Sequence, residues 1–213
     1  MKADAGSVCT GKVLVSESGE HERKWTMTKQ EDHAADAEGL LAAIVFPRDD
    51  DVDSLLFSAA ERLTAEGVRV HGLLPRYAPD PRSPRCIMYV ENLSDGRRFR
   101  ISQDLGPDAS GCRLDPDGLA QACVAARSSL GPETEFVIVN RFGRAEAEGG
   151  GARGIIEDCL ASGIPLLVAV RDAYEGDWQD FHGGLAETLA NDESAVTAWC
   201  LRAARLRSHA VPG

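Results

Sequence analysis

The feature that most limits how this chain can fold is a short apolar strand followed directly by a polar, glycine-rich segment. Residues 136–139 read FVIV, a run that is typical of a strand buried on both faces of a parallel sheet. The segment that follows, NRFGRAEAEGGG at residues 140–151, is charged and rich in glycine. Open α/β sheets bind their ligands at the carboxyl ends of the strands. The sequence therefore predicts a ligand site directly after this strand.

The other strand-like runs and helix-like patterns alternate along the chain. Strand-like runs lie at residues 40–46, 68–74 and 164–170, and helical patterns at residues 52–67, 115–130, 155–163 and 191–205. An Asp-Gly turn between residues 86–93 and 97–102 predicts a β-hairpin. Alternating strands and helices favour right-handed crossovers and a parallel sheet. We predict a three-layer α/β fold, with a mainly parallel sheet, helices on both faces and an inserted β-hairpin.

Length and charge limit the organisation of the chain and its partners. The chain has 213 residues and a formal net charge of −11. We predict a flexible polar leader over residues 1–38, one α/β domain over residues 39–205 and a tail over residues 206–213. Such an acidic chain is not expected to bind nucleic acid, which requires a basic face. No apolar run approaches the roughly 20 residues of a membrane span, so we expect a cytoplasmic protein without membrane contact.

Four predicted strands run into an arginine, namely Arg48, Arg76, Arg141 and Arg171. If these strands lie side by side, their guanidinium groups start from one edge of the sheet and form a cradle for an anion. The predicted ligand-binding residues are Arg48, Arg76, Asn140, Arg141, Gly143, Arg144, Glu148, Gly149, Gly150 and Gly151. The alternative is that each arginine pairs with a nearby carboxylate, such as that of Asp53, and caps the sheet.

The turn after the first predicted strand, PRDDDVD, lacks the residues of a phosphate loop. A P-loop needs GxxxxGK followed by Ser or Thr, and this turn has neither glycine nor lysine. Asp49, Asp51 and Asp53 are candidates for a metal site, but capping of the following helix is the interpretation we favour. We predict no metal site, and the sequence identifies no cofactor. The six cysteines lack metal-binding spacing and are expected to be free thiols, with Cys123 and Cys159 buried.

Several strings of residues resemble a known family. AAIVF, DDDVDSLL, GCRLDPDGLAQA, VIVNRFGRAEAEGGGARGII and GIPLLVAV, in that order, resemble the bacterial domain-of-unknown-function 2478 family over residues 40–203. The order of elements is also similar to that of the THEP-type nucleoside triphosphatases of the P-loop class. That likeness implies a P-loop-like scaffold. Asn140 and Arg141 stand where those enzymes carry an aspartate and a glutamate. The resemblance therefore implies a scaffold without hydrolytic residues, and the family's association with molybdenum metabolism implies an oxyanion ligand.

These features predict non-hydrolytic binding of a small anion by a sensor or accessory protein. The ligand expected is an oxyanion such as molybdate or phosphate, or a nucleotide. One alternative is a divergent metal-dependent nucleotide phosphohydrolase, in which residues 49–53 hold a metal and Glu146 or Glu148 is the base. A further alternative is an interaction module that presents its hairpin, with Arg97, Arg98 and Arg100, to a protein partner.

Overall fold

The computed structural model describes residues 39–48, 50–81, 86–104 and 114–210, which build one seven-stranded sheet. In sheet order the strands are β4 (Arg98–Arg100), β3 (Ile87–Asn92), β2 (Val70–Ala78), β5 (Phe136–Phe142), β6 (Leu166–Arg171), β1 (Leu41–Phe46) and β7 (Ala186–Leu189). All pairings among β1, β2, β5, β6 and β7 are parallel. β3 and β4 form the predicted hairpin, which joins β2 in antiparallel orientation.

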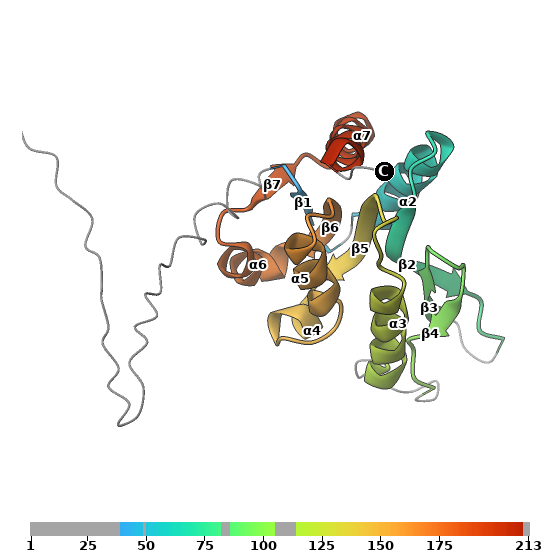
Figure 1. Ribbon diagram of the computed structural model, residues 1–213. Coiled ribbons are helices and arrows are strands. Elements are labelled where there is room, and N and C mark those ends of the chain that lie inside the picture. The colour runs from blue at the N-terminus through green and yellow to red at the C-terminus, as the bar shows by residue number, and fades with distance from the viewer. Residues whose placement is uncertain (1–38, 49, 82–85, 105–113, 211–213) are drawn as a thin grey trace, which may run out of the picture.

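Helices cover both faces of this sheet, which confirms the predicted three-layer α/β fold (Figure 1). α2 (Val52–Ala65) and α7 (Glu193–Ala210) lie on one face, and α3 (Pro116–Ser128) and α5 (Arg153–Ala161) lie on the other. The short α4 (Arg144–Ala147) follows β5. The 3-10 turn η1 (Asp172–Tyr174) and α6 (Glu175–His182) follow β6.

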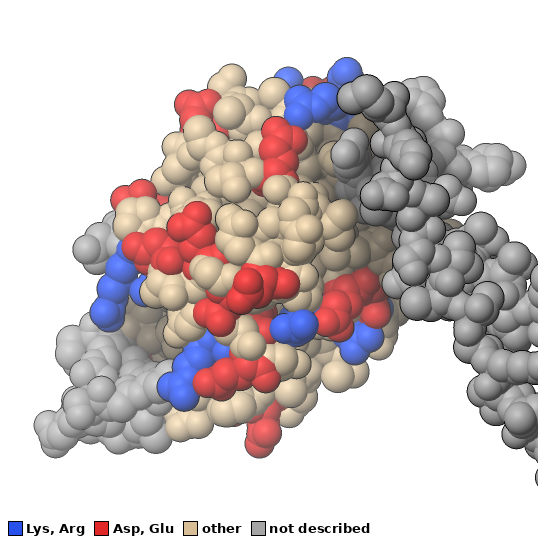
Figure 2. Space-filling view, turned by 90° about the vertical axis from the view of Figure 1, so that its left-hand side faces the viewer, with Lys and Arg blue, Asp and Glu red and all other residues tan. Residues whose placement is uncertain are grey.

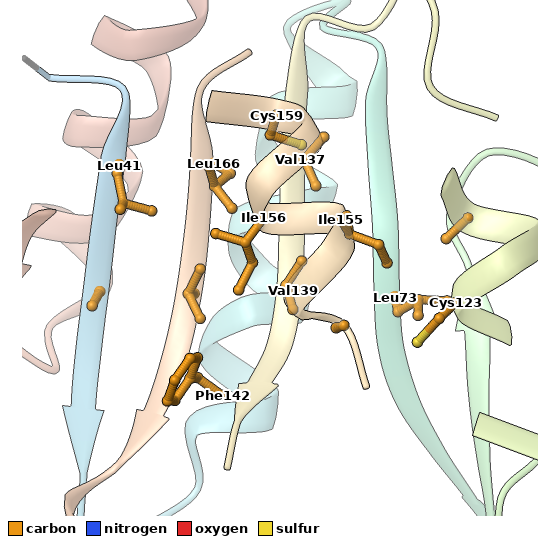
Figure 3. Packing of buried hydrophobic residues seen from close by; sticks show 14 of the residues in the cluster. Leu41, Leu73, Cys123, Val137, Val139, Phe142, Ile155, Ile156, Cys159 and Leu166 are labelled. Atoms are coloured by element: carbon orange, nitrogen blue, oxygen red, sulfur yellow. The ribbon is translucent and has the colours of Figure 1, made fainter. Parts of the chain in front are cut away.

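β5 is buried on both faces, as its continuous apolar run predicts. Val137 and Val139 pack against the α3 and α5 side, where Ile155 covers the sheet (Figure 3). Phe136 and Ile138 pack on the opposite face of the sheet, in the hydrophobic core under α2 and α7. Full burial of one such side chain contributes about 1.5–3 kcal/mol. The strand that carries the predicted site is therefore held rigidly at the centre of the sheet.

Two aspartates begin helices as their positions predict. The Asp51 carboxylate accepts a hydrogen bond from the Ser54 amide at 3.1 Å and caps α2. The Asp115 carboxylate accepts from the Asp117 and Gly118 amides, and Pro116 occupies the first helical position of α3. Each side chain supplies an acceptor to amides that have no partner within the helix.

Some predicted boundaries are wrong, and some short elements were not predicted. β2 runs through Pro75 and Arg76 to Ala78, although residues 68–74 were the predicted strand. β7 was not predicted, because its four residues AETL carry no apolar run. α7 continues to Ala210, beyond the predicted end of the last helix at Arg205. The segment directly after β5, for which no helix was predicted, forms the short helix α4. The predicted leader, residues 1–38, lies outside the described residues.

The surface is largely acidic on one side of the molecule. Figure 2 views the side on which α6 and β7 lie, and carboxylates predominate there over basic groups. η1 and α6 contribute the exposed side chains of Asp172, Glu175, Asp177 and Asp180. Among the described helices, none combines the length and apolar character that crossing a bilayer requires.

Candidate functional site

Asn140 and Arg141 lie at the carboxyl end of β5, where a bulge interrupts the strand. Asn140 pairs with Ala169 of β6 and Phe142 pairs with Val170, so the register skips Arg141. Bulges redirect side chains at the ends of strands. The Arg141 guanidinium lies 5.3 Å from the centre of the Phe46 ring, and its Nε donates to Asn140 Oδ1 at 3.2 Å.

The Asp53 carboxylate of α2 links these two residues of β5 to Tyr77 of β2. Asp53 Oδ1 accepts from Asn140 Nδ2 at 2.6 Å and from an Arg141 Nη2 at 3.3 Å. Asp53 Oδ2 accepts from the Tyr77 hydroxyl at 3.1 Å. Asp53 belongs to the first turn of α2, and Tyr77 lies near the end of β2. We call these four residues the Asp53 cluster: Asp53, Tyr77, Asn140 and Arg141.

The cluster is internally neutralised; Asp53, Asn140 and Arg141 are partly buried, whereas Tyr77 is 54 % exposed. The Asp53 side chain is 19 % exposed and that of Arg141 is 32 % exposed. Burial raises the pKa of Tyr77 above its usual value, and the nearby Asp53 charge acts in the same direction. Tyr77 therefore remains a neutral hydroxyl donor at physiological pH. In chemical terms, the cluster presents three donors around the two oxygens of one carboxylate.

Two further arginines lie at the same edge of the sheet. Arg48 follows β1, is exposed, and makes no ion pair or side-chain hydrogen bond within the described part of the chain. Arg171 ends β6 and pairs in register with Phe46, the residue whose ring lies beneath Arg141. The Arg171 Nε is buried and has no hydrogen-bond partner within the described part of the chain. Arg48, Arg141 and Arg171 thus lie at or just beyond the carboxyl ends of three adjacent strands, β1, β5 and β6.

Arg76 does not join them, which corrects its predicted position at a strand end. Arg76 lies within β2 and forms an ion pair with Glu91 of β3 at 2.9 Å. Its guanidinium stacks over Phe57 at 4.1 Å from the ring centre. The hydrogen bond from Arg76, with that from Arg98, lowers the pKa of Glu91. Arg76 lines a hollow of about 410 Å³ between α2 and the hairpin, away from Arg141.

The segment from Gly143 to Gly151 is organised around Glu146, whose side chain is buried. Glu146 accepts from the Gly143 amide at 3.0 Å and from the Ala152 amide at 2.9 Å. The Gly149 and Gly150 amides donate to the Glu146 and Ala145 carbonyls. These amides were predicted to contact an anion, but in this structure they are used within the turn between α4 and α5.

Glu146 and Glu148, the two candidate bases of the hydrolase alternative, lie in different surroundings. Burial raises the pKa of Glu146, although its hydrogen bonds with backbone amides act in the opposite direction. Glu148 has a 64 % exposed side chain and forms an ion pair with Arg144 at 2.8 Å. The two carboxylates therefore have separate structural roles.

The aspartates after β1 do not assemble a metal site in the described structure. Asp51 caps α2, and the Asp53 oxygens accept from the three donors of the cluster. Asp49 lies outside the described residues. Among the residues that are described, no group of three or more His, Cys, Asp or Glu side chains is arranged to hold a metal ion.

The buried cysteines are free thiols, as predicted for Cys123 and Cys159. Burial is the main cause that raises the pKa of Cys123 to about 11, and those of Cys159 and Cys200 to about 12. All three remain protonated at neutral pH, so they act as packing residues.

The fold places this protein in a recognised structural class. The solution structure of a human cancer-related nucleoside triphosphatase matches 81 % of this chain and 99 % of its own, with a TM-score of 0.55 and 16 % identity. The crystal structure of THEP1 from the hyperthermophile Aquifex aeolicus matches 72 % of this chain and 90 % of its own, with a TM-score of 0.51 and 11 % identity. The chain is an α/β protein with a P-loop-NTPase-like fold, and its turn after β1 has no P-loop sequence.

Sequence similarity identifies the particular family. The chain belongs to the family described as protein of unknown function (DUF2478), whose profile matches residues 41–199. It is also 35 % identical over 159 residues to the molybdenum import ATP-binding protein ModC 2 of Bradyrhizobium diazoefficiens. That match covers 75 % of this chain and 18 % of ModC 2, so the chain spans less than a fifth of that protein.

The sequence placed Asn140 and Arg141 at a strand end, and the alternative in which an arginine pairs with Asp53 holds for Arg141, but Tyr77 was missed. Tyr77 directly follows Arg76, and only a β2 that continues past Pro75 brings its hydroxyl to Asp53. The sequence signal that could have shown the true length of β2 is the predicted hairpin, because its first strand, β3, pairs with Leu73–Ala78 of β2.

Proposed function

We propose that the chain binds a small oxyanion, or the phosphate of a nucleotide, at the carboxyl edge of its sheet without hydrolysing it. The observation that carries the proposal is the convergence of Asn140, Arg141 and Tyr77 donors on one carboxylate. Carboxylate and oxyanion oxygens accept the same hydrogen bonds, and guanidinium groups favour both. Arg48 and Arg171, which start from the same edge, add positive charge.

We propose that the chain does not hydrolyse its ligand because the residues of the turn after β1 and of the end of β5 differ from those that P-loop enzymes use for hydrolysis. Phosphoryl transfer relies on glycine amides, a lysine and a metal to stabilise charge. The turn after β1 carries neither glycine nor lysine, and Asn140 and Arg141 occupy the end of β5. Of the two bases considered in the hydrolase alternative, Glu146 is buried and accepts from two amides, and Glu148 is exposed and paired with Arg144. The geometry supports binding better than turnover.

Molybdate is the oxyanion we favour, in an accessory role to molybdenum import. The support is the 35 % identity with part of a molybdenum import ATP-binding protein. Because the match covers only 18 % of that protein, its ATP-binding activity is not part of the proposal. A cytoplasmic location belongs to the same proposal.

A thermal-shift screen tests the proposed function. The wild type is melted with molybdate, tungstate, sulfate, phosphate and ATP, each with and without magnesium. A ligand at one hundred times its Kd should stabilise the native state by about 2.7 kcal/mol. We expect a shift with molybdate that Arg141→Ala removes. Arg62→Ala is the control, because Arg62 is an exposed arginine of α2 paired with Glu66. No shift with any oxyanion or nucleotide, or a shift that Arg141→Ala leaves intact, contradicts the proposal.

A further inference from the structure

We infer that Asp53 is an internal competitor that the ligand must displace, and that this exchange restricts the site to dianionic tetrahedral oxyanions. The inference rests on the proposed function, which it extends by assigning the residue that sets ligand charge. Asp53 is thereby a specificity-determining residue and not a ligand contact.

The first support is the way Asp53 fills the site. Its two oxygens engage donors from two other elements: Asn140 and Arg141 of β5 on Oδ1, and Tyr77 of β2 on Oδ2. This is the pattern in which two oxygens of a tetrahedral anion would be held. The Tyr77 hydroxyl has only one proton to donate. It cannot serve Asp53 and a ligand together, so binding that uses Tyr77 requires Asp53 to leave.

The second support is that Asp53 can leave without disrupting α2. The helix is capped by the neighbouring residue, since both oxygens of Asp51 accept from Ser54, one from its amide and one from its hydroxyl. The Asp53 side chain makes no capping bond of that kind; it accepts instead from the three donors of the cluster. The side chain is also 19 % exposed. A rotation toward solvent therefore changes the cluster and leaves the helix start in place.

The third support concerns charge. While Asp53 remains bound, its negative charge opposes any second anion nearby, and like charges a few ångströms apart in a half-buried site repel strongly. A monoanion that replaces Asp53 only exchanges one negative charge for another among the same donors. A dianion brings an additional charge to Arg141, Arg48 and Arg171, which start from the same edge. Exchange is therefore favourable for sulfate, molybdate, tungstate and hydrogen phosphate, and unfavourable for nitrate.

The matched pair Asp53→Asn and Asp51→Asn separates this role from general charge effects. Both substitutions remove one carboxylate from the start of α2. Asparagine caps helices about as well as aspartate, so Asp51→Asn preserves the helix start. Asp53→Asn keeps the size of the side chain but removes the charge that competes for Arg141. Asp53→Ser is a second variant with a smaller side chain, and circular dichroism establishes that each variant is folded.

Isothermal titration calorimetry with molybdate, sulfate and nitrate tests the inference. If the Asp53-bound form holds most of the population, the observed affinity is reduced by the fraction that is free to bind, so Asp53→Asn should tighten molybdate binding by about tenfold. It should also permit nitrate binding, which the wild type and Asp51→Asn lack. Equal or weaker molybdate binding in folded Asp53→Asn and Asp53→Ser overturns the inference.

The outcomes also separate this inference from the proposed function. If the wild type binds molybdate, Arg141→Ala does not, and the Asp53 variants bind as the wild type does, then the site is correct and the exchange is wrong. If neither the wild type nor any Asp53 variant binds an anion, both are wrong.

Discussion

Glu146 lies buried between the end of β5 and the start of α5, and two backbone amides donate to its carboxylate. Gly151, with a φ of +56°, passes so close that an added Cβ would lie 2.1 Å from Glu146 Oε1. The glycine run after β5 is therefore explained at this position by packing against a buried side chain. A ligand is not needed to account for it.

Gly151→Ala should destabilise the protein far more than Gly149→Ala. Both glycines have positive φ, which costs alanine about 1–2 kcal/mol, but an added Cβ at Gly149 meets nothing within 4 Å. At Gly151 the clash also displaces Glu146 from its amides, and a buried amide left without a partner costs about 1–3 kcal/mol. Chemical denaturation should place Gly151→Ala below Gly149→Ala by about 2 kcal/mol. Equal stability of the two variants would contradict the role assigned to Glu146.

The stability of the protein should depend on pH through Glu146. Burial raises its pKa in the folded protein above the ordinary value of 4.5. The folded state then binds this proton more tightly than the unfolded state does, so the contribution is complete below pH 4.5 and is lost as pH rises through the folded pKa. The free energy of unfolding of the wild type, relative to Glu146→Gln, should fall as pH increases from 4.5. A rise over that range would mean that the amide hydrogen bonds dominate.

Single residues of the site could be located from the sequence, and Asp53 was one candidate partner of the arginines, but the choice among candidate partners could not be made. Asn140 and Arg141 follow an apolar run, and that local pattern fixes them at a strand end. Their contacts with Asp53 and Tyr77 depend on β2 lying beside β5 and on where α2 begins. Those are long-range facts of sheet order, which no local pattern carries.

Among the elements, α3 shows how a helix can be fixed against the hairpin by one glycine. Gly118 lies in the first turn of α3, and an added Cβ there would lie 2.1 Å from the Arg100 carbonyl oxygen of β4. The neighbouring Asp115 amide donates to the Ile101 carbonyl at 2.9 Å. The start of α3 therefore packs directly on the hairpin backbone.

Gly118→Ala and Gly176→Ala should have opposite effects on stability. In a helix, alanine is normally better than glycine by about 0.5–1 kcal/mol. Gly176 lies in α6 with nothing within 4 Å of an added Cβ, so Gly176→Ala should stabilise the protein by about that amount. Gly118→Ala should destabilise it by about 1–3 kcal/mol, because backbone must move to admit the methyl group. Thermal melts compare the two; stabilisation by Gly118→Ala would show that α3 is not held in this way.

The elements themselves were predictable where their apolar patterns are strong. β1, β5 and β6 have continuous apolar runs; the structure places β1 and β6 within one or two residues of the expected bounds, and β5 begins where expected but runs three residues further. β2 was predicted too short because Pro75 suggests a strand end. Its pairing with β5 stops at Leu73, so Pro75 pairs only with β3, and proline is tolerated at such an edge position.

At the scale of the whole molecule, an acidic protein presents arginines at one edge of its sheet. The formal net charge is −11, which disfavours the approach of anions in general. Arg48, Arg141 and Arg171 gather at the ends of three adjacent strands, among the aspartates that follow β1 and β6. This arrangement follows from the fold, and it is the reason to expect a defined anion site on an acidic surface.

Equilibrium dialysis of molybdate against the wild type and Arg141→Ala, with bound metal quantified by mass spectrometry, tests this claim most directly. We predict saturable binding of one molybdate per wild-type chain, together with loss of that binding in Arg141→Ala and its retention in Arg62→Ala. Absence of saturable binding to the wild type, or equal binding by Arg141→Ala, would contradict an anion site at the end of β5.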